Sequence, residues 1–258
     1  MKSTAQTPAA PTVALFVTCL VDAFRPSVGF AALRLLERSG AHVRVPQGQV
    51  CCGQPAYNNG DLDTARAIAR QVIETFAGFE RVVVPSGSCA GMLKLHYPEL
   101  FADDPAWAPR ARAFAGRVCE LSQFLTECGL AVDASYHGVA AYHDSCSSLR
   151  EMGVRAEPRA LLAQVEGLAV KDLADPEVCC GFGGTFCVKY PDISTRLVSD
   201  KAADVRATGA DTLLAADLGC LMNIAGRLQR EGSDIRVFHY AEVLAGMTDG
   251  PGIGETTE

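Results

Sequence analysis

The sequence reads Cys51-Cys52-Gly53-Gln54-Pro55 at one place and Cys179-Cys180-Gly181-Phe182-Gly183-Gly184 at another. Both stretches contain Cys-Cys-Gly, and each copy is flanked by two further cysteines. The first set of four is Cys19, Cys51, Cys52 and Cys89, and the second is Cys146, Cys179, Cys180 and Cys220. The motif is separated from its flanking cysteines by 31 and 36 residues in the first set and by 32 and 39 in the second. These two sets predict two metal or iron–sulfur sites on a duplicated scaffold.

The duplication extends beyond the cysteines. Apolar runs that end in a cysteine align in pairs, residues 13–19 with 139–146 and residues 82–89 with 212–220. A third pair, residues 118–125 and 237–244, has similar patterning. A repeat of about 120 residues is too long for a solenoid unit and indicates two homologous lobes.

Strand-like and helix-like segments alternate along each lobe. The helical patterns cover residues 27–39, 61–76, 158–165 and 194–208, and several end at a glycine. This alternation predicts an α/β fold of two βαβ-type lobes with mostly parallel sheets. Residues 98–116 have no counterpart in the second lobe and are expected to form a loop with some packed aromatic surface. The expected divisions are a flexible tail at 1–11, lobes at 12–134 and 135–248, and a flexible tail at 249–258.

Composition and charge exclude several classes of protein. The net charge of −7 argues against a general nucleic-acid binder, which would carry a basic stripe. No apolar run approaches the roughly 18 residues of a membrane span, and residues 1–11 lack the apolar core of a signal peptide. We therefore expect a cytoplasmic protein. In that reducing compartment, eleven cysteines indicate metal binding or redox chemistry rather than a disulfide framework.

Several of the repeated cysteines are expected where strands end and helices begin, the place where parallel α/β sheets bind ligands. These are Cys19, Cys89, Cys146 and Cys220. A helix N-terminus lowers the pKa of a thiol and favours an anionic cluster. Adjacent cysteines on a strand would point to opposite faces, so each Cys-Cys pair must lie on a turn, which the following glycine permits. The glycine-rich second copy suits a backbone that offers N–H groups to cluster sulfurs.

The remaining cysteines are interpreted differently. Cys119 and Cys128 have no matching thiol in the other lobe and are expected to be buried structural residues. Cys187, just after the glycine-rich turn, is interpreted as a core thiol or a neighbour of the ligands. Iron–sulfur chemistry is favoured over zinc because neither set contains a close Cys-x-x-Cys pair, and zinc stays open, above all in the first lobe. His143 and His239 could each tune a cluster or move protons, although a satisfied structural role is favoured for both.

With these motifs the chain resembles the CCG cysteine-rich domain family. The matching segments are residues 51–58, 85–92, 179–186 and 217–223. The family includes the heterodisulfide reductase B subunit and the iron–sulfur subunit of glycolate oxidase, and the chain resembles its short members of the lactate utilization protein A type. The resemblance implies an electron-transfer subunit with one or two [4Fe–4S] clusters that takes part in oxidising L-lactate to pyruvate. It also implies a ferredoxin-like partner subunit and a third lactate-utilization subunit.

Other functions stay open at this point. The chain could be a heterodisulfide-reductase-like or glycolate-oxidase-like redox subunit, or an assembly protein stapled by zinc. Fuller members of the family end each repeat with Cys-x-x-Cys, but here Ser86 and Asp217 occupy the first position of that pair. Four thiols suffice for a cubane cluster, so a five-thiol cluster is not expected. Asp217 could be a carboxylate ligand, but we favour an Asp that accepts hydrogen bonds from turn N–H groups.

Overall fold

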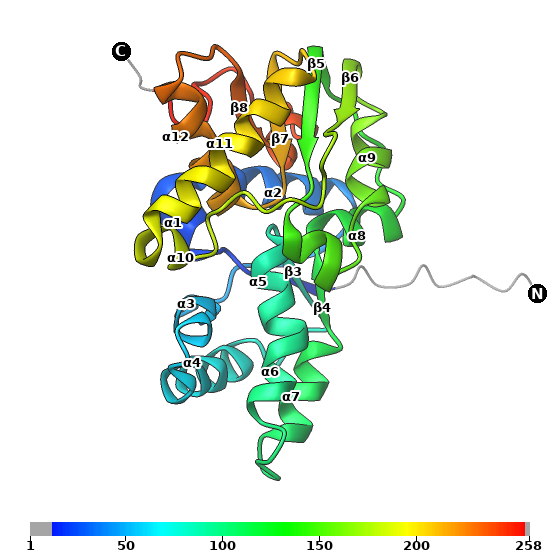
Figure 1. Ribbon diagram of the computed structural model, residues 1–258. Coiled ribbons are helices and arrows are strands. Elements are labelled where there is room, and N and C mark those ends of the chain that lie inside the picture. The colour runs from blue at the N-terminus through cyan, green and yellow to red at the C-terminus, as the bar shows by residue number, and fades with distance from the viewer. Residues whose placement is uncertain (1–11, 256–258) are drawn as a thin grey trace, which may run out of the picture.

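The computed structural model describes residues 12–255, which form two four-stranded sheets, one from each half of the chain (Figure 1). Sheet one has the order β2-β1-β3-β4 and sheet two the order β6-β5-β7-β8, and all neighbouring strands are parallel. The strands of sheet one are β1 (Thr12–Leu15), β2 (His42–Arg44), β3 (Arg81–Val84) and β4 (Val118–Glu120). Those of sheet two are β5 (Ser135–His143), β6 (Glu166–Asp172), β7 (Thr212–Ala215) and β8 (Arg236–His239). The identical strand order confirms the predicted α/β fold of two homologous lobes.

The helices of the first lobe include two close to the predicted positions, α2 (Pro26–Arg38) and α4 (Leu62–Thr75). Asp61 begins α4 by accepting a hydrogen bond from the Thr64 N–H at 3.1 Å. The other helices are α1 (Cys19–Phe24), α3 (Gln54–Asn58), α5 (Gly87–Gly91), η1 (Met92–His96), α6 (Tyr97–Leu100), α7 (Ala108–Ala115) and α8 (Leu121–Glu127).

The segment 98–116 is not simply the loop that we expected, because it includes all of α7 and most of α6. The expected aromatic packing is present: Phe101 and Trp107 stack with ring centroids 5.6 Å apart, and Phe114 is buried. Pro109 lies in the first turn of α7, where a proline is tolerated because its missing N–H needs no partner.

The second lobe repeats the arrangement with a different set of turns. Its helices are η2 (Ser147–Glu151), α9 (Ala156–Leu162), α10 (Phe186–Lys189), α11 (Pro191–Ala207), α12 (Leu218–Arg230) and α13 (Tyr240–Leu244). The predicted helices at 158–165 and 194–208 correspond to α9 and α11. No helix formed by residues 12–255 is long and apolar enough to cross a membrane.

Helices from both lobes form a shared core. The α2 helix packs against α13, and α8 packs against α9, so each pair joins the two halves of the chain. Figure 1 shows α8 next to α9. Leu35 and Leu125 of the first lobe belong to the same buried apolar cluster as Tyr142 and Phe238 of the second. This packing fixes the lobes against each other, with the strand ends that carry the cysteines on both sides of the junction.

The ends of the chain were expected to be tails. Residues 1–11 and 256–258 lie outside the described residues. Ile253 is buried, and its N–H donates to the Val237 carbonyl of β8 at 2.7 Å. The Pro251 carbonyl accepts a hydrogen bond from Arg25 at 2.8 Å. The division of the lobes between residues 134 and 135 stays a prediction.

Candidate metal centre

A single cavity of about 420 Å³ lies between the lobes, and all eight repeated cysteines line it. In both lobes the first cysteine follows the first strand and the last cysteine follows the third strand of the repeat. The Cys-Cys pairs lie in irregular backbone before α3 and α10. The duplicated fold thus brings together residues that are up to 201 positions apart, since Cys19 and Cys220 line the same space.

Neighbouring cysteine side chains in the first set are hydrogen-bonded to one another. The Cys19 and Cys51 sulfurs are 3.5 Å apart. Hydrogen bonds from the Cys19 and Cys52 thiols lower the pKa of Cys51 to about 3. The hydrogen bond to Cys51, together with burial, raises the pKa of Cys19 and of Cys52. These hydrogen bonds therefore favour the thiolate form of Cys51, and the thiolate is the form that binds metals.

The second set is also linked by hydrogen bonds between neighbouring cysteines. The Cys180 and Cys220 sulfurs are 2.9 Å apart, and the Gly181 N–H donates to the Cys179 sulfur at 3.3 Å. Hydrogen bonds from the Cys146 and Cys180 thiols lower the pKa of Cys179 to about 2. The hydrogen bond from Cys180 also lowers the pKa of Cys220.

The residues present are suited to holding metal. Each lobe offers four sulfur donors, and at least one of them is stabilised as a thiolate. Four thiolates are the donor set of a cubane iron–sulfur cluster and of a structural zinc site. Clustered cysteines of this kind can bind a metal ion or an iron–sulfur cluster.

Glycine is required at both Cys-Cys turns. Gly53 and Gly181 have φ values of +84° and +81°, a backbone conformation that residues with a side chain rarely adopt. A Cβ atom on Gly181 would lie 2.7 Å from the Ser194 carbonyl oxygen, and one on Gly53 would lie 3.2 Å from the Ile68 side chain. The second turn is therefore the tighter of the two.

Ser86 and Asp217 stand where fuller members of the family have a fifth cysteine in each repeat, and their side chains contact each other between the lobes. Ser86 donates to the Asp217 carboxylate at 2.5 Å, and Ser88 donates to the same oxygen through its hydroxyl at 2.6 Å and its N–H at 3.1 Å. From its own lobe Asp217 accepts hydrogen bonds from the Ser145 and Ser148 hydroxyls. Asp217 is 3% exposed.

The expected role of Asp217 is thus only partly correct. It accepts a turn N–H, but that N–H belongs to the opposite lobe, and its side chain makes no capping hydrogen bond to α12. Sequence reasoning missed Ser88, Ser145 and Ser148, since serines without characteristic spacing give no signal of a shared partner.

The two histidines differ, although a satisfied structural role was expected for both. His239 fits that expectation: its Nε2 contacts the Ala216 and Pro85 carbonyl oxygens at 2.7 and 3.3 Å, and its Nδ1 accepts from the Ala241 N–H. His143 does not fit it, because among the described residues neither ring nitrogen has a hydrogen-bond partner. A ring nitrogen of His143 lies within 4.8 Å of the Cys180 and Cys220 sulfurs.

A buried carboxylate also lies at the lobe junction. Glu120 begins α8, accepts from the Ser122 N–H at 2.7 Å, and accepts from the Tyr240 hydroxyl of the other lobe at 2.9 Å. Burial raises the pKa of Glu120 to about 7. The capping-box spacing of Glu120 and Gln123 is the sequence signal that would have identified it.

The three unrepeated cysteines lie outside the cavity lining. Cys119 is buried in β4, and burial raises its pKa to about 11. Cys187 is half-buried, with its sulfur 3.5 Å from the Gly184 carbonyl oxygen. The expectation that Cys128 is buried was wrong, because it ends α8 and is exposed.

Comparisons with known proteins agree with the duplication. The family model of the CCG cysteine-rich domain matches residues 13–94 and 140–225, together more than half of the chain. The chain is 50% identical to lactate utilization protein A of Bacillus cytotoxicus and 51% identical to that of Shouchella clausii. Each match spans 234 residues, 90% of this chain and 98% of the relative.

Among solved structures, a hypothetical protein from Helicobacter pylori matches with a TM-score of 0.67 at 12% identity. The match covers 95% of this chain and 52% of that protein. At this identity the likeness shows a shared fold alone.

Proposed function

The chain belongs to the CCG cysteine-rich domain family, and on this premise we propose that it is the iron–sulfur electron-transfer subunit of a system that oxidises L-lactate to pyruvate. The observation that carries the proposal is the pair of four-thiol sets around one cavity. The names of the relatives, lactate utilization protein A, support the metabolic role.

The charge around the cavity supports electron transfer over direct substrate binding. The described residues that line it include the carboxylates Asp217 and Glu151, no lysine or arginine, and one imidazole, His96. The His96 ring nitrogens already contact the carboxylates of Glu99 and Glu151 at 2.9 and 3.8 Å. A 2-hydroxy acid is an anion at neutral pH and is usually held by cationic side chains. We therefore assign lactate binding to a partner subunit and the passage of electrons to this chain.

A bound [4Fe–4S] cluster in either lobe would accept and release single electrons. The protein's part is to hold the sulfurs and to shield them. Cys52, Cys89, Cys180 and Cys220 are buried, while Cys19 and Cys146 are exposed. Oxidation of lactate to pyruvate releases two electrons and two protons, and two one-electron sites match that number of electrons. In this proposal the partners are a ferredoxin-like subunit and a third lactate-utilization subunit, all in the cytoplasm.

A five-thiol centre of the heterodisulfide-reductase kind is not favoured. The positions of the fifth thiols carry Ser86 and Asp217, which hydrogen-bond to each other. That contact leaves four thiols for each lobe, so we propose cubane clusters on Cys19, Cys51, Cys52 and Cys89 and on Cys146, Cys179, Cys180 and Cys220.

Anaerobic purification followed by iron, sulfide and zinc analysis tests this proposal. Two cubane clusters give about eight iron atoms and eight sulfides per chain, and one cluster gives about four of each. The variant Cys187→Ser is the control, since its sulfur does not line the cavity, and it should keep the full iron content. Stoichiometric zinc without iron after anaerobic reconstitution would overturn the electron-transfer role and leave the zinc-stapled assembly protein.

A further inference from the structure

His143 is a buried polar residue whose imidazole ring makes no hydrogen bond to the described part of the chain. It is 1% exposed, and neither ring nitrogen has a hydrogen-bond partner among residues 12–255. An imidazole buried in this way carries a desolvation cost, so an unsatisfied ring indicates a partner that binds later. The sulfurs of Cys180 and Cys220 lie within 4.8 Å of a ring nitrogen, and as thiolates they can accept a hydrogen bond.

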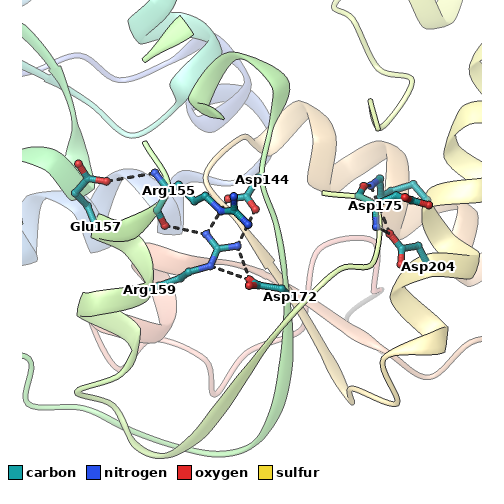
Figure 2. A network of polar contacts seen from close by, with 8 residues as sticks. Asp144, Arg155, Glu157, Arg159, Asp172, Asp175 and Asp204 are labelled. Atoms are coloured by element: carbon teal, nitrogen blue, oxygen red, sulfur yellow. Dashed lines mark hydrogen bonds and ion pairs between the residues drawn. The ribbon is translucent and has the colours of Figure 1, made fainter. Parts of the chain in front are cut away.

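The residue that follows His143 is held in place by an ion pair. Asp144 is buried directly after His143, and its two carboxylate oxygens accept hydrogen bonds from the Arg159 guanidinium at 2.8 and 2.7 Å (Figure 2). The same guanidinium binds Asp172 at 2.6 Å (Figure 2). The end of β5 is therefore anchored to α9 and β6.

The surroundings favour a hydrogen-bond donor over a metal ligand. A histidine that binds metal through one nitrogen almost always donates its other N–H to a carboxylate or carbonyl group. His143 has no such partner, and Asp144 is occupied by Arg159.

We propose that His143 is a positioning residue that donates a ring N–H to the Cys220 thiolate when the second lobe holds its cluster, and that this raises the cluster's reduction potential above that of the first lobe. The inference rests on the proposed iron–sulfur function. Hydrogen bonds to ligand sulfurs stabilise the more negative, reduced cluster and so raise the potential.

The first lobe supplies the natural control. The position three residues before Cys19 carries Phe16, which is buried and packs on Phe76 with ring centroids 5.4 Å apart. Phe16 cannot donate a hydrogen bond. Both lobes therefore have four thiols, and at this equivalent position the second has an imidazole where the first has a phenyl ring.

The test is a potentiometric EPR titration of the reconstituted protein, comparing His143→Phe and His143→Gln with wild type. A Cys52→Ser background isolates the second-lobe signal, and a Cys180→Ser background isolates the first. His143→Phe should keep the iron of the second lobe and make its reduction equilibrium about tenfold less favourable, about 59 mV for one electron. His143→Gln keeps an N–H donor and should restore most of the shift, while the first-lobe signal stays unchanged.

Two results would overturn the inference while leaving the proposed function intact. Loss of second-lobe iron in both His143 variants would make His143 a ligand, and an unchanged potential in His143→Phe would make the residue purely structural. If His143→Phe does not fold, His143→Leu provides the same comparison. Wild-type protein without iron would instead overturn the proposed function, and this inference with it.

Discussion

The two lobes keep the same sheet order and the same four cysteine positions, yet differ in what surrounds the sulfurs. Phe16 in the first lobe corresponds to His143 in the second, and Ser86 corresponds to Asp217. The first Cys-Cys turn leads into α3, whereas the second continues through Gly183 and Gly184, both with positive φ. The duplicated scaffold has preserved its donors and varied the polarity around them, which is the means by which a protein tunes the potential of a cluster.

The comparison also shows how the lobes are joined. Ser86 and Asp217 are equivalent positions, because each precedes the helix that carries the last cysteine of its lobe. Their side chains hydrogen-bond to each other across the junction. Glu120 and His239 form a second equivalent pair, since each begins the helix after the last strand of its lobe. Both pairs are buried at the junction, so the asymmetry between lobes lies where they meet.

The largest effect should come from Asp217→Ala. Its removal leaves hydroxyls of both lobes without their buried acceptor, and we expect a loss of about 3 kcal/mol in unfolding free energy. Ser86→Ala at the equivalent position removes one of several donors and should cost about 1 kcal/mol. Urea unfolding of both variants measures the difference. Equal losses would break the assignment of Asp217 as the central acceptor.

Glu120 and His239 should give the junction opposite pH dependences. The folded-state pKa of Glu120 is raised to about 7, so its stabilising contribution is lost as the pH rises from about 4.5 through 7. The full loss is on the order of 3 kcal/mol. Burial lowers the pKa of His239, so its contribution is present above its ordinary pKa and is lost as the pH falls.

Thermal unfolding between pH 5 and 8 separates these contributions. Glu120→Gln should flatten the decline in stability toward neutral pH, and His239→Gln should flatten the decline on the acid side. If Glu120→Gln and the wild-type protein show the same pH dependence of thermal unfolding, the raised pKa of the Glu120 carboxyl is contradicted.

The two Cys-Cys turns should differ in how they tolerate a side chain. Gly181→Ala combines a positive φ with a contact of 2.7 Å to the Ser194 carbonyl oxygen, and should cost about 2 kcal/mol. Gly53→Ala has a similar φ, but it meets the Ile68 side chain, which can shift, and should cost about 1 kcal/mol. Unfolding free energies of the two variants test the order, and the reverse order would contradict the tighter second turn.

Much of the fold could be predicted because the repeat was visible in local patterns. Apolar strands, helices that end at glycine and paired motifs located α2 and α4 to within one residue at each end. The helix α7 was missed because Pro105 and Pro109 indicate a loop, although a proline also suits a first helical turn.

The site was predictable only as a set of thiols. The contact between Ser86 and Asp217 joins residues 131 positions apart and depends on how the lobes dock through α2 and α13, which no local pattern encodes. The difference between His143 and His239 depends on the backbone carbonyls that surround one ring and not the other. Neither fact can be read from the spacing of the histidines.

The central claim is that the shared cavity holds two separate four-cysteine centres. Iron analysis and EPR of reduced Cys52→Ser and Cys180→Ser proteins test it most directly. The account predicts that each variant loses about half of the wild-type iron, and that the signal lost in one variant is the signal kept in the other. Loss of all iron in both variants, or of none in either, would contradict it.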